Sequence, residues 1–251
     1  MTLSDGALLF GSAAAAGAIN AVAGGGSFFT FPALVFTGLP SIAANATSTM
    51  AVWPGSLASM GAYRDDIRRE RRHLPGLLLV SLLGGLLGAA VLLRTPQPVF
   101  DRVLPWLMLF ATLVFASGNR AVVWLTGHRP AGARVNAASW LLQFAIATYG
   151  GYFGGGMGLL MLAMLSLVGL TDIHAMNGIK NLLAVALNGI ALLAFVWAGL
   201  VAWPQASVMI VGAVLGGYGG AVYAKRIDPR VIRGFVIVFG LALTAWFFWR
   251  R

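Results

Sequence analysis

The sequence predicts an all-α polytopic membrane protein built from two inverted repeats. Three observations lead to this fold class. Only 10% of the 251 residues are charged and 59% are hydrophobic, whereas ordinary globular domains carry about 25% charged residues. Apolar runs of membrane-spanning length recur along the whole chain, and an unusual glycine-containing segment occurs twice. No alternating apolar–polar pattern of the kind found in membrane β-barrels is present, so the spans are expected to be helices.

Ten apolar runs follow one another along the chain, and most of them have the length of a membrane span. A transmembrane helix takes about 20 residues. Eight runs come close to this length: 7–23, 42–62, 76–93, 103–118, 137–153, 175–200, 204–223 and 231–249. Two shorter runs, 28–39 and 157–170, each follow a triple glycine. We therefore expect about eight full transmembrane helices plus two short helices that are broken or re-entrant.

The basic residues indicate the topology. Although the net charge is +10, twelve of the seventeen Lys and Arg residues fall in three short loops. They are Arg64, Arg68, Arg69, Arg71, Arg72, Arg120, Arg129, Arg134, Lys225, Arg226, Arg230 and Arg233. This is the positive-inside pattern of membrane proteins, and it argues against a nucleic-acid partner. The loops are predicted to be cytoplasmic, in a bacterial-type inner membrane, with both termini outside. Since no basic residues precede the run 7–23, it is expected to be a retained helix and not a cleaved signal.

An internal duplication organises the chain. When the two glycine triplets are aligned, Asn45 lies over Asn177, and small length differences bring Gly38-Leu39 over Gly169-Leu170. The predicted units are a first transmembrane repeat over 1–118, a basic cytoplasmic linker over 119–136 and a second repeat over 137–251. The first unit contains five apolar elements, an odd number, which turns the second unit upside down relative to the first. Inverted repeats with broken helices near the midplane are a recurrent plan of secondary transporters.

The glycine triplets invite two interpretations. Glycine inside a helix costs about 1 kcal/mol relative to alanine, so three in a row need a reason. One reason is close helix packing, which small residues permit in membranes; the pairs Gly84-Gly85 and Gly216-Gly217 are expected to do only that. The other is a break in the helix at membrane depth, which is tolerated only inside protein or beside a wet cavity. A short helix that starts after such a break directs its N–H groups and positive dipole end into the cavity and can attract an anion.

Polar residues on one face of two helices provide further candidates. At about 100° per residue, Asn177, Lys180 and Asn181 share one arc of the run 175–200, and Asn45, Ser48 and Thr49 repeat the arrangement in the run 42–62. They could form hydrogen bonds that hold helices together, or they could line a binding site.

Lys180 is the most informative of these residues. It lies about 9 Å into its helix, at 1.5 Å per residue past His174, and all seven acidic residues lie at termini, in loops or at the ends of spans. The side chain could snorkel to the interface. A lysine with no acidic partner near it in the sequence would instead suit an anionic substrate, and the lack of buried carboxylates argues against cation transport.

No enzyme chemistry is predicted. The three histidines are far apart, cysteine is absent, and the glycine-rich segments lack the strand–turn–helix setting of a nucleotide site. The sequence therefore predicts no catalytic residues, no metal site and no cofactor.

Two quoted segments resemble a known family. "INAVAGGGSFFTFPALVFTGLPSIAANATST" and "YGGYFGGGMGLLMLAMLSLVGLTDIHAMNGIKNLLAVALNGIALLAFVWAGLVAW" are similar to the two halves of the sulfite exporter TauE/SafE family of membrane permeases, and the resemblance spans nearly the whole chain. It implies transport of a small sulfur-containing anion, of the sulfite, sulfonate or sulfoacetate class, across the cytoplasmic membrane. One departure is that Leu162-Ala163 stands where the first half has Pro32-Ala33, so the two half-sites need not be equivalent.

The sequence thus favours a secondary transporter that works by alternating access, one repeat rocking against the other, with export the favoured direction. An anion channel, an uptake permease for another small organic anion, and a membrane scaffold or chaperone subunit are the alternatives. The expected partners are the small anion, the lipid bilayer and, as an open alternative, a coupling ion or proton. The predicted substrate-binding residues are Gly24, Gly25, Gly26, Ser27, Asn45, Ser48, Thr49, Gly154, Gly155, Gly156, Asn177, Lys180 and Asn181.

Overall fold

The described part of the chain is helical throughout in the computed structural model of the protein. The structure describes residues 1–22, 26–62, 67, 74–127, 137–170, 172–223 and 229–249. Ten helices cover most of them: α1 (Leu3–Val22), α2 (Ser27–Phe36), α3 (Ser41–Ala62), α5 (Leu74–Arg94), α6 (Gln97–Gly127), α7 (Ala137–Tyr152), α8 (Met157–Leu167), α9 (Ile173–Trp197), α10 (Trp203–Tyr223) and α11 (Pro229–Trp249). Each predicted apolar run corresponds to one of these helices, so the all-α prediction is confirmed for the described residues.

One helix is longer than the sequence pattern predicts. The run 103–118 lies inside α6, which begins at Gln97 and continues to Gly127, well into the predicted basic linker. Charge marks where a segment leaves the membrane, but a single basic residue does not end a helix. The strong helix breakers of this segment, Gly127 and Pro130, come later in the sequence.

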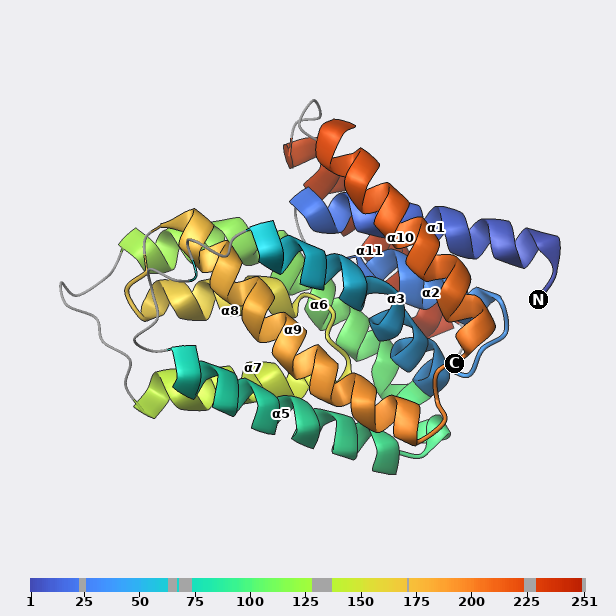
Figure 1. The fold of residues 1–251 in the computed structure, drawn as a ribbon, viewed down its shortest axis with the longest axis horizontal. Helices are drawn as coiled ribbons and strands as arrows, with labels where there is room; N and C mark the ends of the chain where they lie inside the picture. The colour runs from blue at the N-terminus through green and yellow to red at the C-terminus, as the bar shows by residue number, and fades with distance from the viewer. Residues whose placement is uncertain are drawn as a thin grey trace.

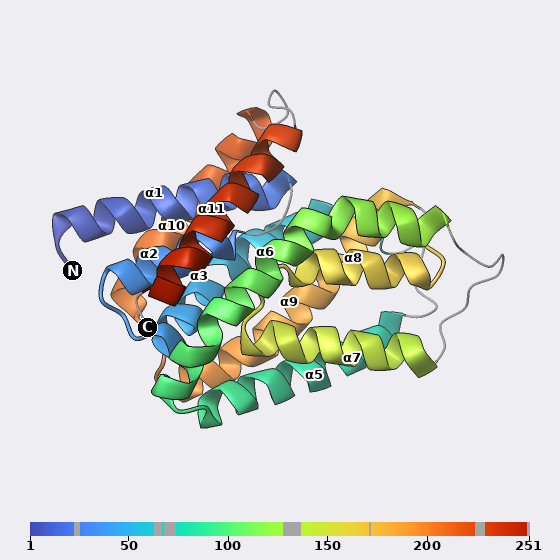
Figure 2. The same ribbon diagram turned by 180° about the vertical axis from the view of Figure 1, so that it is seen from behind.

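Two helical hairpins shape the interior. α1 is followed by the short α2, and α7 by the short α8, and in each pair the second helix turns back along the first (Figures 1 and 2). Both short helices end in the same way. Gly38 and Gly169 have φ angles of +87° and +105°, and the following leucine N–H donates to the carbonyl five residues earlier at 3.2 Å in both cases. This is the Schellman type of helix end, which needs a glycine because of its left-handed residue.

The helix ends gather on two opposite sides of the molecule. The ends that precede and follow the segments 63–73, 128–136 and 224–228 lie at the left and top of Figure 1. Both termini and the connections 37–40 and 198–202 lie at the right (Figure 1).

Helices from the two sequence halves pack directly on each other. α10 packs along α1 and contacts α3, while α5 packs along α7 and contacts α9. Glycine makes these approaches possible: a Cβ atom on Gly216 would lie 2.0 Å from the carbonyl oxygen of Ala14, and one on Gly88 would lie 2.1 Å from that of Thr148. A Cβ atom on Gly84 or Gly85 would also come too close to a neighbouring helix, at 2.7 and 2.8 Å from the nearest atom, which confirms the packing role predicted for them.

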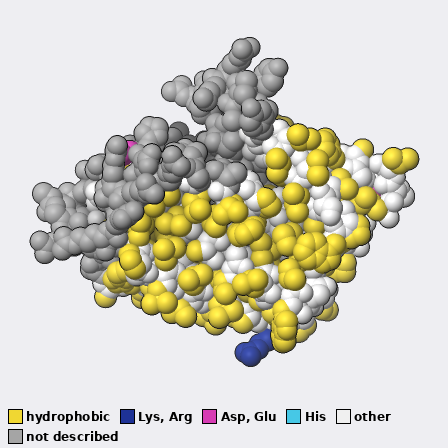
Figure 3. All heavy atoms as spheres, viewed as in Figure 1, with side chains coloured by type: hydrophobic (Ala, Val, Ile, Leu, Met, Phe, Trp, Pro, Cys, Tyr) yellow, Lys and Arg dark blue, Asp and Glu magenta, His cyan; other side chains and the backbone are white. Residues whose placement is uncertain are grey.

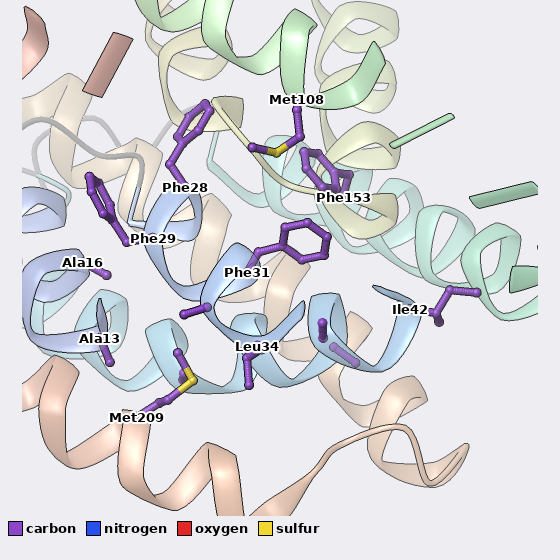
Figure 4. Packing of buried hydrophobic residues seen from close by; sticks show 14 of the residues in the cluster. Ala13, Ala16, Phe28, Phe29, Phe31, Leu34, Ile42, Met108, Phe153 and Met209 are labelled. Carbon is purple, nitrogen blue, oxygen red and sulfur yellow. The ribbon is translucent and has the colours of Figure 1, made fainter. Parts of the chain in front are cut away.

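The buried apolar side chains form two clusters. The smaller one lies among α5, α7, α8 and α9 and contains residues such as Leu77, Ala147 and Leu183. The larger one is built mainly from α1, α2, α3, α6, α10 and α11, and Figure 4 shows Phe31 and Leu34 of α2 inside it. The short helix α2 is therefore enclosed by protein: seven of its ten residues are buried.

The outer surface is apolar. Large side chains such as Leu79, Leu83 and Leu141 are more than half exposed, and hydrophobic atoms cover most of the described surface in the view of Figure 3. Among the described residues, three helical segments are long and apolar enough to cross a membrane by length and composition: Leu74–Arg94, Gln97–Ser117 and Ala175–Trp197. A contiguous apolar surface of this kind is what a bilayer covers.

Candidate anion site at the second glycine break

The chain between α7 and α8 is a break whose backbone can attract an anion. Gly154 and Gly156 have φ angles of +81° and +73°, while Gly155 between them does not have a positive φ. Such an alternation turns successive N–H groups to one side and forms the anion-binding concavity known as a nest. Residues other than glycine rarely adopt a positive φ, which explains the glycines at positions 154 and 156.

Hydrogen bonding makes the break electropositive. The carbonyl oxygens of Gly154 and Gly156 accept from Met157 N and Leu159 N at 3.3 and 3.1 Å. Within the described part of the chain, by contrast, no acceptor faces the N–H groups of Gly155, Gly156 and Gly158. Unpaired N–H groups at the start of a helix carry partial positive charge, and here they lie in the first turn of α8 and in the nest that precedes it.

Two side chains donate hydrogen bonds to further carbonyl groups at the break. Asn45 of α3 is only 4% exposed, and its Nδ2 donates to the carbonyl oxygen of Tyr152 at 3.0 Å. The Tyr149 hydroxyl donates to the carbonyl oxygen of Gly155 at 2.6 Å. Asn45 thus comes from the first half of the chain and supports the break in the second half.

Lys180 lies beside this break. Its Nζ donates to Asn177 Oδ1 at 3.0 Å, and its Cδ would be 3.5 Å from a Cβ atom on Gly158, in the first turn of α8. The lysine stem therefore runs along the start of α8, where no side chain at Gly158 displaces it. A cation and unpaired N–H groups on adjoining elements form a suitable arrangement for a small anion.

The other predicted residues of α3 and α9 have different surroundings. Asn181 is partly buried and makes no hydrogen bond to the described residues. The Thr49 hydroxyl donates to the carbonyl oxygen of Asn45 one turn earlier, at 2.9 Å. α3 and α9 pack on each other, and the Trp53 indole N–H donates to the carbonyl oxygen of Val185 at 3.1 Å.

The first glycine break differs from the second. Gly24 and Gly25 lie outside the described residues, Gly26 has a helical φ of −54°, and Ser27 is partly buried. The hydroxyl groups of Ser48 and Thr30 bond to each other at 2.7 Å, which joins α3 to α2.

The position that corresponds to Gly158 is also different in the first half. Phe28 stands there and is only 2% exposed, with its ring edge-on to Phe115 at 6.1 Å between centroids. In the part of the chain that the structure describes, no cation lies beside the start of α2, and the buried Phe28 occupies the position that is open at Gly158.

The sequence pointed to Lys180, Asn45 and the glycines of the second break, and the structure places Asn45 against Tyr152 at the end of α7 and Lys180 beside Gly158 at the start of α8. It missed Tyr149 and Gly158. The only signal for Tyr149 is its place shortly before the triplet, and nothing in the sequence tells which backbone carbonyl its hydroxyl reaches.

Comparison with known proteins agrees with these features. A profile of the sulfite exporter TauE/SafE family matches residues 9–247. The chain belongs to this family. It is 29% identical over 248 residues to a protein of Haemophilus influenzae named "Probable membrane transporter protein", with 95% of this chain and 92% of that protein covered.

Further relatives carry similar names. "Probable membrane transporter protein ORF9" of a Sinorhizobium species is 29% identical over 247 residues, with 94% of this chain and 90% of that protein covered. "Probable membrane transporter protein YfcA" of Escherichia coli K12 is 28% identical over 244 residues, with 95% and 87% covered. No solved structure matches the chain. Membership of this family and the apolar helices together indicate that the protein is a membrane transporter.

Proposed function

We propose that the protein is a secondary transporter that moves a small sulfur-containing anion, of the sulfite, sulfonate or sulfoacetate class, out of the cell across the cytoplasmic membrane. The observation that carries this proposal is the second glycine break. The N–H groups of Gly155, Gly156 and Gly158 have no acceptor among the described residues, and the Lys180 side chain passes beside Gly158. A small oxyanion has several acceptor oxygens, so it can take all of these donors at once. The family to which the chain belongs supports the substrate class.

The binding role is centred on the second half. Gly154, Gly155 and Gly156 form the nest, Lys180 supplies the charge, and Asn181 is the amide that has no other partner among the described residues. Asn177 orients the lysine, and Thr49 donates to the carbonyl oxygen of Asn45 on α3. Gly24, Gly25, Gly26, Ser27 and Ser48 belong to the pseudo-equivalent first break. We propose that this break is structural, because Ser48 bonds to Thr30 and Phe28 is buried in the place of Gly158.

Matched packing supports the proposal of two inverted repeats. α1 contacts α2 and α10, just as α7 contacts α8 and α5, and α3 contacts α9 near the middle. These contacts of one half thus have counterparts in the other half. The helix ends also gather on two sides of the molecule (Figure 1), which suits a topology with the basic loops in the cytoplasm and both termini outside.

The moving parts follow from the same packing. Because α10 is packed on α1 and α5 on α7 through glycines, we propose that these mixed pairs move as units. Rocking would then separate the α5–α7–α8–α9 group from the α1–α2–α3–α10 group, and the sequence halves themselves would not separate.

A disulfide can test this division because the chain contains no cysteine. A Cβ atom on Gly212 would be 3.3 Å from the Ala13 Cβ and 2.6 Å from the Phe10 carbonyl oxygen. A small shift of α10 away from α1 relieves the second contact and brings the first closer to the usual disulfide separation of about 3.8 Å. The variant Ala13→Cys/Gly212→Cys links the two sequence halves. If the mixed pairs move as units, oxidation leaves the flux unchanged, whereas rocking of the sequence halves predicts that oxidation stops transport.

The function itself is tested with the purified protein in liposomes loaded with radiolabelled sulfite. A transporter gives saturable flux that accelerates when unlabelled sulfite is present on the opposite side. An anion channel gives flux and current without that acceleration. A scaffold or chaperone subunit gives no flux above that of empty liposomes. Either of the last two results would refute the proposal, and the same assay with everted vesicles separates export from uptake.

A further inference from the structure

The Tyr149 hydroxyl donates a hydrogen bond to the backbone of the second glycine break. It reaches six residues along the chain, from the last turn of α7 to the carbonyl oxygen of Gly155. Gly155 is the residue between the two left-handed glycines of the nest. The Gly155 carbonyl shares a peptide plane with the Gly156 N–H, which is one of the unpaired donors among the described residues, so the direction of that carbonyl determines which way this N–H faces.

A glycine peptide can turn over because no Cβ restricts it. If the Gly155–Gly156 peptide turned, its carbonyl oxygen would replace the Gly156 N–H on the inner side of the nest, and a bound anion would face negative charge. A hydroxyl donor 2.6 Å from that oxygen opposes this turn, since breaking the bond would leave a carbonyl group without a partner inside protein.

The tyrosine is itself held in place from α6. Its ring lies edge-on to Phe110 at 5.3 Å and to Phe153 at 6.4 Å between centroids. On the same helix, the carbonyl oxygen of Ala111 would be 3.2 Å from a Cβ atom on Gly156. α6 therefore backs both the glycines and the side chain that fixes them.

We infer that Tyr149 is a positioning residue that holds the Gly155 carbonyl outward and so keeps the second glycine break in its anion-binding form. The inference rests on the proposed function for the identity of the anion, but the ordering of the break by Tyr149 can be measured without any ligand. The residue need not touch the substrate.

The chain offers a matched control for the test. Tyr152 is three residues away on the same helix, and its hydroxyl makes no hydrogen bond to the described residues. Tyr149→Phe and Tyr152→Phe each remove one hydroxyl from α7, but only the first removes the bond to Gly155.

Two measurements are made on both variants in lipid nanodiscs. The first is hydrogen–deuterium exchange of the peptide that covers residues 150–160, without ligand. The second is the affinity for sulfite, together with KM and maximal rate in liposomes. For Tyr149→Phe we expect exchange at least several-fold faster than for Tyr152→Phe. We also expect sulfite affinity about three- to tenfold weaker at an unchanged maximal rate, the range of one lost hydrogen bond.

Equal exchange in the two variants overturns the inference, whatever anion the protein carries. Faster exchange with sulfite affinity equal to that of Tyr152→Phe also overturns it. If the wild-type protein binds no sulfite or organosulfonate, the proposed function fails, and the exchange comparison alone still decides whether Tyr149 orders the break.

Discussion

Replacing Lys180 by methionine removes the only charge found beside the second break among the described residues, and keeps a side chain of similar length. The Lys180 Cδ lies beside Gly158 at the start of α8, and its Nζ donates to Asn177 Oδ1 at 3.0 Å. Two opposite unit charges about 4 Å apart interact by about 4 kcal/mol at an effective dielectric constant of about 20. The cost of removing both from water offsets part of this, and hydrogen bonds to charged groups contribute about 1.5–3 kcal/mol net. We therefore expect Lys180→Met to weaken anion binding by about 2–3 kcal/mol, roughly 30- to 150-fold in Kd.

The assay is equilibrium binding of radiolabelled sulfite to purified protein, followed by flux in liposomes. Arg94→Met serves as the control. Arg94 is exposed at the end of α5, so this substitution also removes one positive charge, but at a site away from the break. The control should bind within about twofold of the wild type, and Lys180→Arg should retain most of the affinity because it keeps the charge. A Lys180→Met protein that is folded and binds sulfite as tightly as the Arg94→Met control would refute the reasoning.

Three further predictions concern the backbone around the site. Gly156→Ala forces a residue with a side chain into φ +73°, which costs about 1–2 kcal/mol, and it should weaken sulfite binding. Gly199→Ala is the control, because Gly199 has a similar φ of +68° in the α9–α10 turn. It should lower thermal stability by a similar amount but leave the sulfite affinity unchanged in the same binding assay. Gly88→Ala places a Cβ 2.1 Å from a carbonyl oxygen of α7 and should lower the free energy of unfolding by about 1–3 kcal/mol. Gly11→Ala should leave that free energy unchanged, because its Cβ meets nothing within 4 Å. Thermal unfolding in detergent compares the two variants. Asn45→Ala removes a donor to the break and should weaken sulfite binding by about three- to tenfold; unchanged affinity in that variant would mean that α3 does not shape the site.

The fold could be predicted from sequence because membrane helices are specified by composition and length. Each apolar run became a helix, and a new short helix, α2 or α8, begins after each triple glycine. The extension of α6 to Gly127 was not predicted, since basic residues indicate a side of the membrane and not a helix end. The direct packing of helices from one half on helices from the other was also not predicted. A contact such as that of Gly216 with Ala14 depends on tertiary packing that one sequence does not reveal.

The site could be predicted only in part. Lys180 and the second triplet were recognisable, because a charge and poor helix formers are costly inside an apolar protein. The sequence indicated that the two half-sites need not be equivalent, but it did not show how they differ, since the difference involves the Ser48–Thr30 hydrogen bond and the buried Phe28 in the place of Gly158. Tyr149 was missed because its role is a bond to the backbone, which leaves no pattern of residue types in the sequence.

The most direct test of the central claim is hydrogen–deuterium exchange of the wild-type protein in nanodiscs, with and without saturating sulfite. The account predicts that sulfite slows exchange of the amides at 155–158, which lie in the nest and the first turn of α8, and leaves those at 26–30 at the start of α2 unchanged. Protection at 26–30 instead, or no protection at 155–158 while sulfite is bound, would contradict an anion site at the second glycine break.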